Sequence, residues 1–138
     1  MADEARACGV SVSTSGSLST PVDGDRVQIE QVLANLMRNA IEASAQRKRA
    51  DGSVRATLCA SPGSVRIEVE DNGPGVAPDI VERLFEPFET TKQRGMGLGL
   101  SLSREIVRAH NGRLWLDHTS ATGSTFILEL PVKAGISQ

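Results

Sequence analysis

Three glycines alternate with apolar residues in Gly95-Met96-Gly97-Leu98-Gly99-Leu100, and such a run can form a phosphate-binding loop. Apolar residues at helical spacing follow it, at Leu102, Ile106 and Val107, so the run is expected to lead into a helix. Glycine lets a backbone approach a ligand closely, and the unpaired N–H groups of a helix start favour phosphate. Glycine runs also occur in ordinary tight turns, so other residues must decide between the two interpretations.

Two asparagines, Asn35 and Asn39, lie four residues apart inside a segment whose apolar spacing predicts a helix. This spacing places both side chains on one face of the helix. Carboxamide oxygens can bind a hard cation such as Mg²⁺, which takes oxygen ligands from few protein groups and from substrate phosphates. The alternative is a pair of solvent-facing asparagines. Because asparagine is a poor helix former, the pair at mid-helix favours the functional interpretation.

Asp71 ends an alternating strand pattern and is followed by Asn72-Gly73-Pro74-Gly75. A carboxylate at a strand end can accept a hydrogen bond from an amino group such as that of adenine. Taken in isolation, the stretch is better explained as a plain turn, because Asp-Asn-Gly sequences are frequent in turns.

The composition indicates one domain with an aliphatic core. Of the 138 residues, 39% are hydrophobic and only 3% are aromatic. The net charge of -2 argues against a nucleic-acid binder or other general polyanion binder, so any phosphate site must be local. Cys8 and Cys59 match neither a metal site nor a disulfide framework. Since no signal peptide or membrane-spanning run is visible either, we expect a cytoplasmic domain without membrane contact.

The elements expected to position these residues are β-hairpins that alternate with amphipathic helices. Strands are expected at 10–12, 54–60, 65–70, 114–116 and 126–130, and helices at 25–46, 78–85 and 100–109. The intervening 86–99 segment is too long for a simple connection and is expected to be a functional lid. This order predicts an α+β fold, a two-layer sandwich in which a mixed five-stranded sheet is covered on one face by three helices. The apolar stripe of the first long helix should comprise Ile29, Val32, Leu33, Leu36, Met37, Ala40 and Ala43.

Taken together, these stretches resemble the catalytic, ATP-binding domain of sensor histidine kinases, a member of the gyrase, heat-shock-chaperone, histidine-kinase and mismatch-repair ATPase superfamily. The motifs similar to those of the family are an N box at 35–40, a first glycine box at 71–75, an F box at 84–88, a second glycine box at 95–99, and a closing Gly-Ser-Thr stretch at 122–126. Five motifs in the family's order are far more specific than any one of them. The resemblance covers residues 8–131 and implies the Bergerat ATP-binding fold. The lid resembles that of oxygen-sensing and nitrogen-regulating kinases.

The resemblance implies a site for Mg-ATP. Asn39 would bind the Mg²⁺ that bridges the phosphates, with Asn35 supporting it from one turn away. Asp71 would accept a hydrogen bond from the adenine amino group. Gly75 would leave room for the base, and Thr125 would lie beside the same adenine contact, through a water.

For the lid, the resemblance implies that glycines wrap the triphosphate while Phe85 and Phe88 anchor the segment. The full implied set of nucleotide contacts is Asn35, Arg38, Asn39, Asp71, Gly73, Gly75, Val76, Lys92, Gly95, Gly97, Leu98, Gly99, Leu100 and Thr125. The implied catalytic residues are Asn35, Asn39 and Lys92.

Two positions carry their own information. ATP-hydrolysing relatives have a glutamate four residues before the metal-binding asparagine, where this chain has Asn35. A carboxamide cannot take a proton at neutral pH, so ATP should be held for transfer and hydrolysed slowly. Many kinases of the family have a lysine or arginine where this chain has Glu42. Either Arg38 or Lys92 must then supply positive charge to the phosphates.

The family transfers phosphate to a histidine on a separate dimerisation domain, and neither His110 nor His118 has that acceptor context. We therefore expect residues 1–138 to be a single catalytic domain, with a core at about 8–131, excised from a larger sensor kinase. Its partner would be the histidine-containing dimerisation domain and, indirectly, a response regulator. The parent would be a homodimer and this fragment a monomer.

Three alternatives use the same fold. A chaperone- or gyrase-type ATPase is disfavoured by Asn35. A nucleotide-binding module that has lost catalysis is disfavoured because every binding position is filled. A serine kinase acting on a bacterial regulator would differ in its acceptor, which a partner-swap assay would identify.

Overall fold

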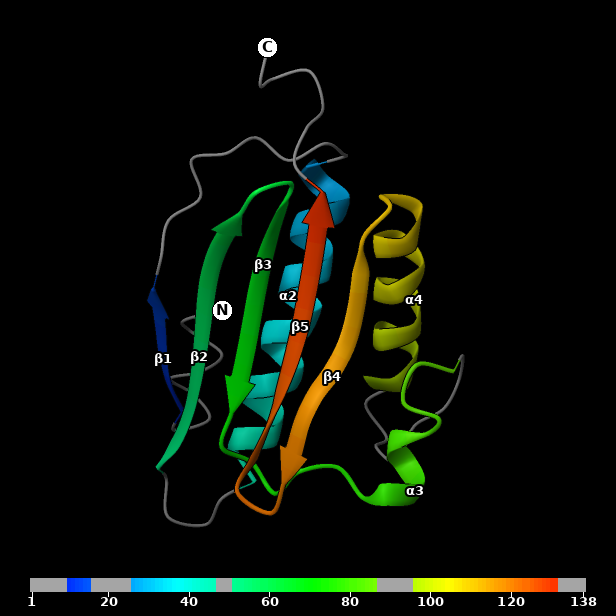
Figure 1. The fold of residues 1–138 in the computed structure, drawn as a ribbon. Coiled ribbons are helices and arrows are strands. Elements are labelled where there is room, and N and C mark those ends of the chain that lie inside the picture. Colours follow the sequence, from blue (N-terminus) through cyan, green and yellow to red (C-terminus); the bar gives the residue numbers. More distant parts are fainter. Residues whose placement is uncertain (1–9, 16–25, 47–50, 87–95, 132–138) are drawn as a thin grey trace.

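The computed structural model describes residues 10–15, 26–46, 51–86 and 96–131, to which all structural statements below refer. The elements are, in chain order, β1 (Val10–Ser15), α2 (Arg26–Ser44), β2 (Gly52–Ser61), β3 (Ser64–Asp71), α3 (Pro78–Val81), α4 (Met96–Ala109), β4 (Arg113–Ser120) and β5 (Gly123–Pro131). Figure 1 shows the strands side by side, with α2 behind them and with α4 and α3 to the right of β4.

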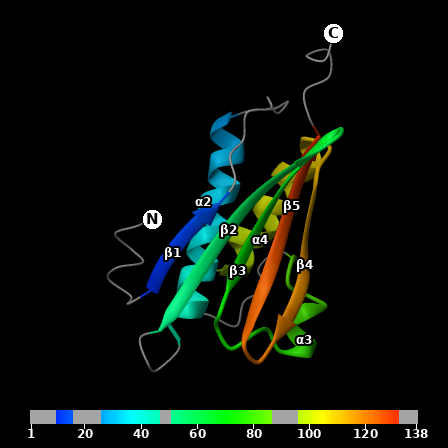
Figure 2. The same cartoon turned by 60° about the vertical axis from the view of Figure 1, so that its left-hand side comes forward.

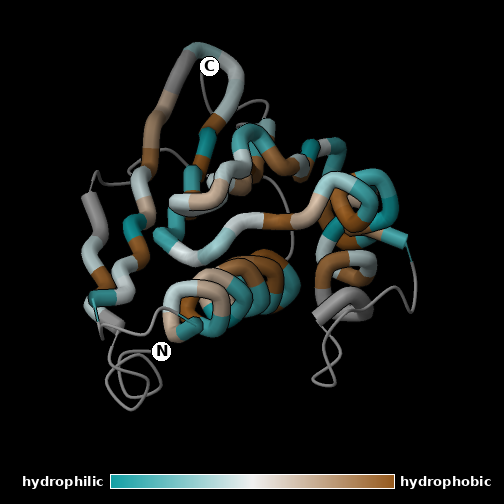
Figure 3. The backbone as a smooth tube through the Cα atoms, turned by 90° about the horizontal axis from the view of Figure 1, so that it is seen from below, coloured by the Kyte–Doolittle hydropathy of each residue, from teal (hydrophilic) through white to brown (hydrophobic). Residues whose placement is uncertain are grey.

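The strands form one mixed sheet with the order β1-β2-β3-β5-β4. β1 pairs with β2 in parallel, and the other three pairs are antiparallel. The oblique view in Figure 2 and the view from below in Figure 3 place the helices on one side of the sheet. The expected α+β sandwich, with a mixed five-stranded sheet and helices on one face, is confirmed.

The core lies between α2, α4 and the inner face of the sheet. Alternation along β3 buries Val65, Ile67 and Val69, as the sequence predicts. The expected stripe of α2 also faces the core except for Ala43, which is half-buried and does not belong to it. Ile41, only 2% exposed, was missed. The apolar face of α2 is wider than one stripe because α2 packs against α4 as well as against β2 and β3.

α3 is shorter than the expected helix at 78–85. It begins at Pro78, which suits a first helical position, and ends at Val81. The chain then continues through turns closed by hydrogen bonds between residues three apart. In these turns the N–H of Arg83 donates to the carbonyl of Ile80, and the N–H of Glu86 donates to the carbonyl of Arg83.

α4 begins at Met96, four residues before the expected start at Leu100, so the end of the supposed glycine loop is already helical. Its end agrees with the expected stop at Asn111-Gly112. Asn111 has a positive φ of 63°, its N–H binds the carbonyl of Arg108, and the N–H of Gly112 binds the carbonyl of Val107. These two bonds define a Schellman cap with asparagine in the left-handed position.

Gly112 is needed for a different reason. A Cβ there would lie 2.4 Å from the carbonyl oxygen of Glu129, so a side chain would push α4 away from β5. The cap leads directly into β4. β4 and β5 form a hairpin whose turn is shorter than the expected 119–124, because Thr119 and Ser120 still pair with β5.

Candidate functional site

The register of β3 and β5 brings Asp71 and Ser124 opposite each other at one end of the sheet. Asp71 is 6% exposed, and Ser124 is also buried. Both belong to the face that carries Val69 and Phe126, which pack into the core beneath the helices. The carboxyl group of Asp71 therefore faces the layer of helices, where a ligand between sheet and helices would lie.

The expected role of Thr125 does not fit this register. Thr125 pairs with Glu70 on β3 and with His118 on β4, one residue out of phase with Asp71. Because successive strand residues face opposite sides, its side chain belongs to the outer face of the sheet. Ser124 takes the position that was assigned to Thr125. The alternation of Phe126, Leu128 and Leu130 could have indicated this, since it places Ser124 on the inner face.

Asp71 also shapes the turn that follows it. Its Oδ1 accepts a hydrogen bond of 2.8 Å from the backbone N–H of Gly73. A Cβ on Gly73 would lie 2.5 Å from the carbonyl oxygen of Ala43. The missing side chain thus lets the end of β3 touch the last turns of α2. The glycine-box sequence forms a turn as expected, and this turn holds Asp71 against α2.

A polar cluster missed by the sequence analysis locks the same corner. Ser44, fully buried at the end of α2, donates to the carbonyl of Ser53 at 2.9 Å and accepts from the N–H of Asn72 at 3.3 Å. The Asn72 side chain accepts from the N–H of Ser53 at 2.8 Å and donates to the carbonyl of Asp51 at 2.9 Å. Ser44 lies four residues after Ala40, and a serine at this stripe position was the available signal.

Gly75 has a structural reason that differs from the one expected. Its φ is +84°, and a Cβ would lie 2.0 Å from the carbonyl oxygen of Ser120. The space left by glycine is filled by the β4–β5 hairpin, so the expectation that it makes room for a base is not supported here. The next residue, Val76, donates its N–H to Oγ1 of Thr119 at 2.9 Å, and that hydroxyl is 2.8 Å from Oγ of Ser124.

The two asparagines of α2 have different surroundings. Asn35 donates from Nδ2 to Oγ of Ser103 on α4 at 3.1 Å, and Ser103 is fully buried. Asn39 is 8% exposed, and its Nδ2 has no hydrogen-bond partner. Along α2, Asn35, Asn39 and Ala43 lie successively one turn apart, and Ala43 touches Gly73. One face of α2 thus carries Asn35 beside α4, Asn39 one turn further on, and Ala43 beside the turn that follows Asp71.

These residues fit a magnesium-bound nucleotide. A buried carboxamide with an unpartnered atom is a group that a ligand would satisfy. Mg²⁺ is bound through few protein oxygens, with phosphate oxygens and waters completing its octahedron. In the described ranges, no cluster of three or more histidine, cysteine or acidic side chains occurs.

The other predicted nucleotide contacts lie in different parts of the fold or outside the described residues. Arg38 is exposed on α2, and Leu100 is buried in the core. Gly97, Leu98 and Gly99 lie in the first turn of α4, which places the second glycine box at a helix start. Lys92, Gly95 and Phe88, together with most of the expected lid, lie outside the described residues.

Phe85 of the F box packs against the core. Its ring meets that of Phe126 edge to face, with centroids 6.3 Å apart, and the guanidinium of Arg104 lies 4.8 Å from its centroid. The role expected for Phe85, anchoring the 86–99 segment, stays a prediction, because residues 87–95 lie outside the described residues.

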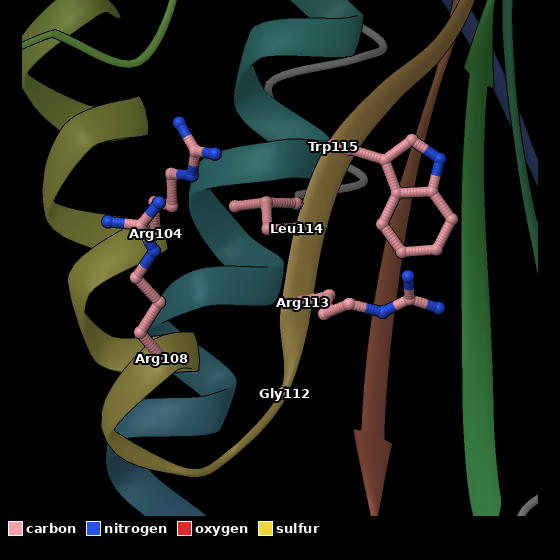
Figure 4. A pocket seen from close by; sticks show the side chains of 6 residues that line it. All are labelled: Arg104, Arg108, Gly112, Arg113, Leu114 and Trp115. Atoms are coloured by element: carbon pink, nitrogen blue, oxygen red, sulfur yellow. The ribbon is translucent and has the colours of Figure 1, made fainter.

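A separate cavity of about 380 Å³ lies between α4 and the edge strand β4. Its lining residues are Arg104, Arg108, Gly112, Arg113, Leu114 and Trp115 (Figure 4). In Figure 4, Arg104 and Arg108 extend from α4, whereas Arg113 and Trp115 lie on the other side of β4. None of the predicted nucleotide contacts lines this cavity.

The outer face of the sheet carries a charged cluster beside this cavity. Glu129 accepts hydrogen bonds from Arg113 at 2.7 Å and from Arg66 at 3.1 Å. Both guanidinium groups also lie over the Trp115 ring, at 4.8 Å for Arg113 and 5.6 Å for Arg66. The hydrogen bonds from Arg113 and then Arg66 hold the pKa of the Glu129 carboxyl below its ordinary value.

None of the helices in the described part of the chain is long and apolar enough to cross a membrane.

Comparison with known proteins gives a consistent result. Residues 24–134 match the family described as histidine kinase-, DNA gyrase B- and HSP90-like ATPases. The sensor protein FixL of Bradyrhizobium diazoefficiens is 49% identical over 107 residues, which cover 78% of this chain and 21% of FixL. The sensory histidine kinase/phosphatase NtrB of Rhizobium meliloti is 39% identical over 131 residues, which cover 85% of this chain and 34% of NtrB. The chain thus spans only a fifth to a third of these relatives.

Solved structures agree with the fold. The catalytic domain of the histidine kinase ThkA, in a nucleotide-free form, matches with a TM-score of 0.79 and 34% identity, over 94% of this chain and 83% of that one. Because the family pattern spans most of the sequence and the ThkA domain has the same fold, the chain belongs to the histidine kinase-, DNA gyrase B- and HSP90-like ATPase family, as a catalytic domain of the sensor histidine kinase type.

Proposed function

We propose that this domain binds Mg-ATP and donates its γ-phosphoryl group to a histidine on a separate dimerisation domain, as one half of a two-component sensor kinase. The observation that carries the proposal is the position of Asn39. It is buried on α2, it has an unpartnered amide nitrogen, and it lies one turn from the contact between Ala43 and the glycine turn after Asp71.

Each residue then has a defined task. Asp71 accepts a hydrogen bond from the adenine amino group at the sheet end. Asn39 presents its carboxamide oxygen to the cation, which when bound neutralises charge on the phosphates. The start of α4, with its glycines, offers backbone N–H groups to the phosphates. Either Arg38 or Lys92 supplies positive charge to the phosphates.

Transfer is favoured over hydrolysis by the state of Asn35. A carboxamide cannot act as a general base, and its amide nitrogen is already engaged with Ser103. In the transfer itself, an imidazole nitrogen of the acceptor forms a bond to the γ-phosphorus, and the bond from that phosphorus to the β–γ bridging oxygen breaks. ADP leaves with the electron pair of the broken bond.

The relatives suggest the partners of the whole protein. One solved structure contains ThkA in complex with the response regulator protein TrrA, and its ThkA chain is 32% identical to this one with a TM-score of 0.76, over 95% of this chain and 36% of that one. By analogy, we propose that the parent of this domain is a homodimer that passes its phosphoryl group from histidine to a response regulator in the cytoplasm.

The test is incubation with γ-labelled ATP, with and without a dimerisation domain that carries the acceptor histidine. The isolated chain should bind ATP, label itself little and hydrolyse ATP slowly. Added acceptor should gain an acid-labile label, more weakly than in a single tethered chain. Fast hydrolysis that is lost in Asn39→Ala would instead indicate an ATPase. An acid-stable label on a serine of the partner would indicate a serine kinase.

A further inference from the structure

Two buried side-chain atoms in the described residues have no hydrogen-bond partner, and both belong to α2. They are Nδ2 of Asn39 and Oε1 of Glu42. Residues three apart in a helix are neighbours on its surface, so the two groups lie on the same face, about one turn from each other. Buried polar atoms without partners are rare in native proteins, so two adjacent ones require an explanation.

The two atoms are chemically complementary. Nδ2 of an asparagine only donates hydrogen bonds, whereas a carboxylate oxygen accepts them. Each atom left alone is destabilising, so the unpaired arrangement is one that a small change of side-chain rotamer could improve. Neither atom has another partner that would have to be given up.

The carboxamide geometry links this pair to the cation. The oxygen and nitrogen of an asparagine side chain diverge from the same planar carbon. If Oδ1 of Asn39 faces a cation, Nδ2 must point away from it and needs an acceptor. The neighbouring Asn35 already has one, Oγ of Ser103. For Asn39, Oε1 of Glu42 is a buried acceptor on the same side of α2 that has no partner.

We propose that Glu42 is a positioning residue for the metal site. In the nucleotide-bound protein its Oε1 accepts a hydrogen bond from Nδ2 of Asn39, which fixes Oδ1 of Asn39 toward the cation. This inference rests on the proposed function, because it needs Asn39 to bind the metal. It also gives a role to an acidic residue at the position where many relatives have a basic one.

The experiment measures ADP affinity by calorimetry, once with excess Mg²⁺ and once with EDTA, for wild type and variants. Glu42→Ala removes the acceptor, and Glu42→Met removes it while keeping the length of the side chain. Both should weaken Mg-ADP binding about ten- to a hundredfold, which is the usual effect of losing a group that orients a metal ligand. Binding of metal-free ADP should stay within about threefold. Glu42→Gln keeps an acceptor oxygen and should retain most of the Mg²⁺ effect.

Three comparisons complete the design. Glu30→Ala removes an exposed acid from the same helix and should leave both affinities unchanged. In an Asn39→Ala background, Glu42→Ala should have no further effect on the dependence on Mg²⁺, because it acts through Asn39. Thermal melting of each variant identifies loss of the fold, and Glu42→Met and Glu42→Gln decide the question if Glu42→Ala unfolds.

The outcomes separate the two proposals. If wild type does not bind ADP in either condition, the proposed function fails. If wild type shows the Mg²⁺ effect and the Ala and Met variants keep it in full, only the role of Glu42 is refuted. The role of Glu42 is also refuted if Glu42→Gln loses the Mg²⁺ effect as Glu42→Ala does and both variants bind metal-free ADP more tightly. Glu42 would then act through its charge. The role of Glu42 would also be refuted if Glu42→Ala lowered the Mg-ADP affinity equally in the wild-type and Asn39→Ala backgrounds, because the two effects would then be additive.

Discussion

The corner where β3 meets α2 and the outer face of the sheet around Glu129 are both rich in polar groups, yet they are built differently. At the corner, Asp71, Asn39 and Ser124 are buried. Gly73 and Gly75 bring backbone segments into direct contact there. On the outer face, Glu129 and two arginines lie among partly exposed groups that water and salt can screen. One added methyl group should therefore disrupt the packing at the corner. On the outer face, by contrast, a single charge can be replaced with a small loss of stability.

The largest effect should come from filling the backbone contact at the corner. Gly75 and Gly63 have nearly the same φ, +84° and +86°, but a Cβ meets Ser120 only at Gly75 and open space at Gly63. Gly63→Ala should cost about 1–2 kcal/mol of unfolding free energy from the left-handed backbone alone. Gly75→Ala should cost about 3 kcal/mol or more, because overpacking adds to it. Urea unfolding of both variants checks this, and equal losses would contradict it.

The second largest effect should be on ligand affinity rather than on stability. Asp71→Asn keeps one oxygen for the N–H of Gly73 but replaces the other by an amide nitrogen, which cannot accept from adenine. ATP affinity should fall about ten- to a hundredfold, since a base left unpaired costs about 1–3 kcal/mol. Glu70→Gln, on the adjacent strand position facing outward, is the matched control. Calorimetry that finds the same ATP affinity in Asp71→Asn and wild type would rule out this contact.

A smaller effect is expected where α2 meets α4. Ser103→Ala removes the acceptor for Asn35 and should lower the unfolding free energy by about 1 kcal/mol. In an Asn35→Ala background the same change should cost less, because the hydrogen bond is already gone. Chemical denaturation of the four proteins gives the coupling. A coupling of zero would mean that the bond does not contribute in solution.

The smallest effect should be on the outer face and should depend on pH. The pKa of Glu129 is lowered in the folded protein, so its stabilising contribution is complete above the unfolded-state pKa of about 4.3 and is lost as pH falls through the lower folded value. Glu129→Gln should therefore flatten the decline of stability below about pH 5. High salt should reduce the difference between the two proteins. Parallel declines at low pH would argue against a shift at this residue.

The periodic parts of the fold could be predicted from the sequence because a buried face repeats apolar residues at the period of its helix or strand. The β3 alternation is of this kind and was confirmed, and the α2 stripe was confirmed except for Ala43. Ile41 was missed because α2 packs against a helix and a sheet at once, which a single stripe does not describe. The start of α4 was placed too late because glycine has a low helix propensity, and here the tertiary context outweighs it.

The position of a candidate site residue could be predicted where a motif fixes it within one element, as with Asp71 at the end of β3. Such positions were less predictable where the answer depends on pairing between distant strands. The choice between Ser124 and Thr125 is decided by the register with Asp71, and a shift of one residue reverses the face. Ser44 and Asn72 form bonds across three elements, and no local pattern specifies such partners.

The register between Asp71 and Ser124 also has a consequence for the order of folding. The β2–β3 and β4–β5 hairpins each join neighbouring segments and can form within about 1–10 μs, whereas the β3–β5 pairing joins distant segments and is slower. Asp71 belongs to the first hairpin and Ser124 to the second, so this corner exists only once the hairpins have docked. We therefore expect nucleotide to bind late in refolding and to act as a reporter of docking. A refolding intermediate that binds nucleotide before β3 and β5 amides are protected would contradict this order.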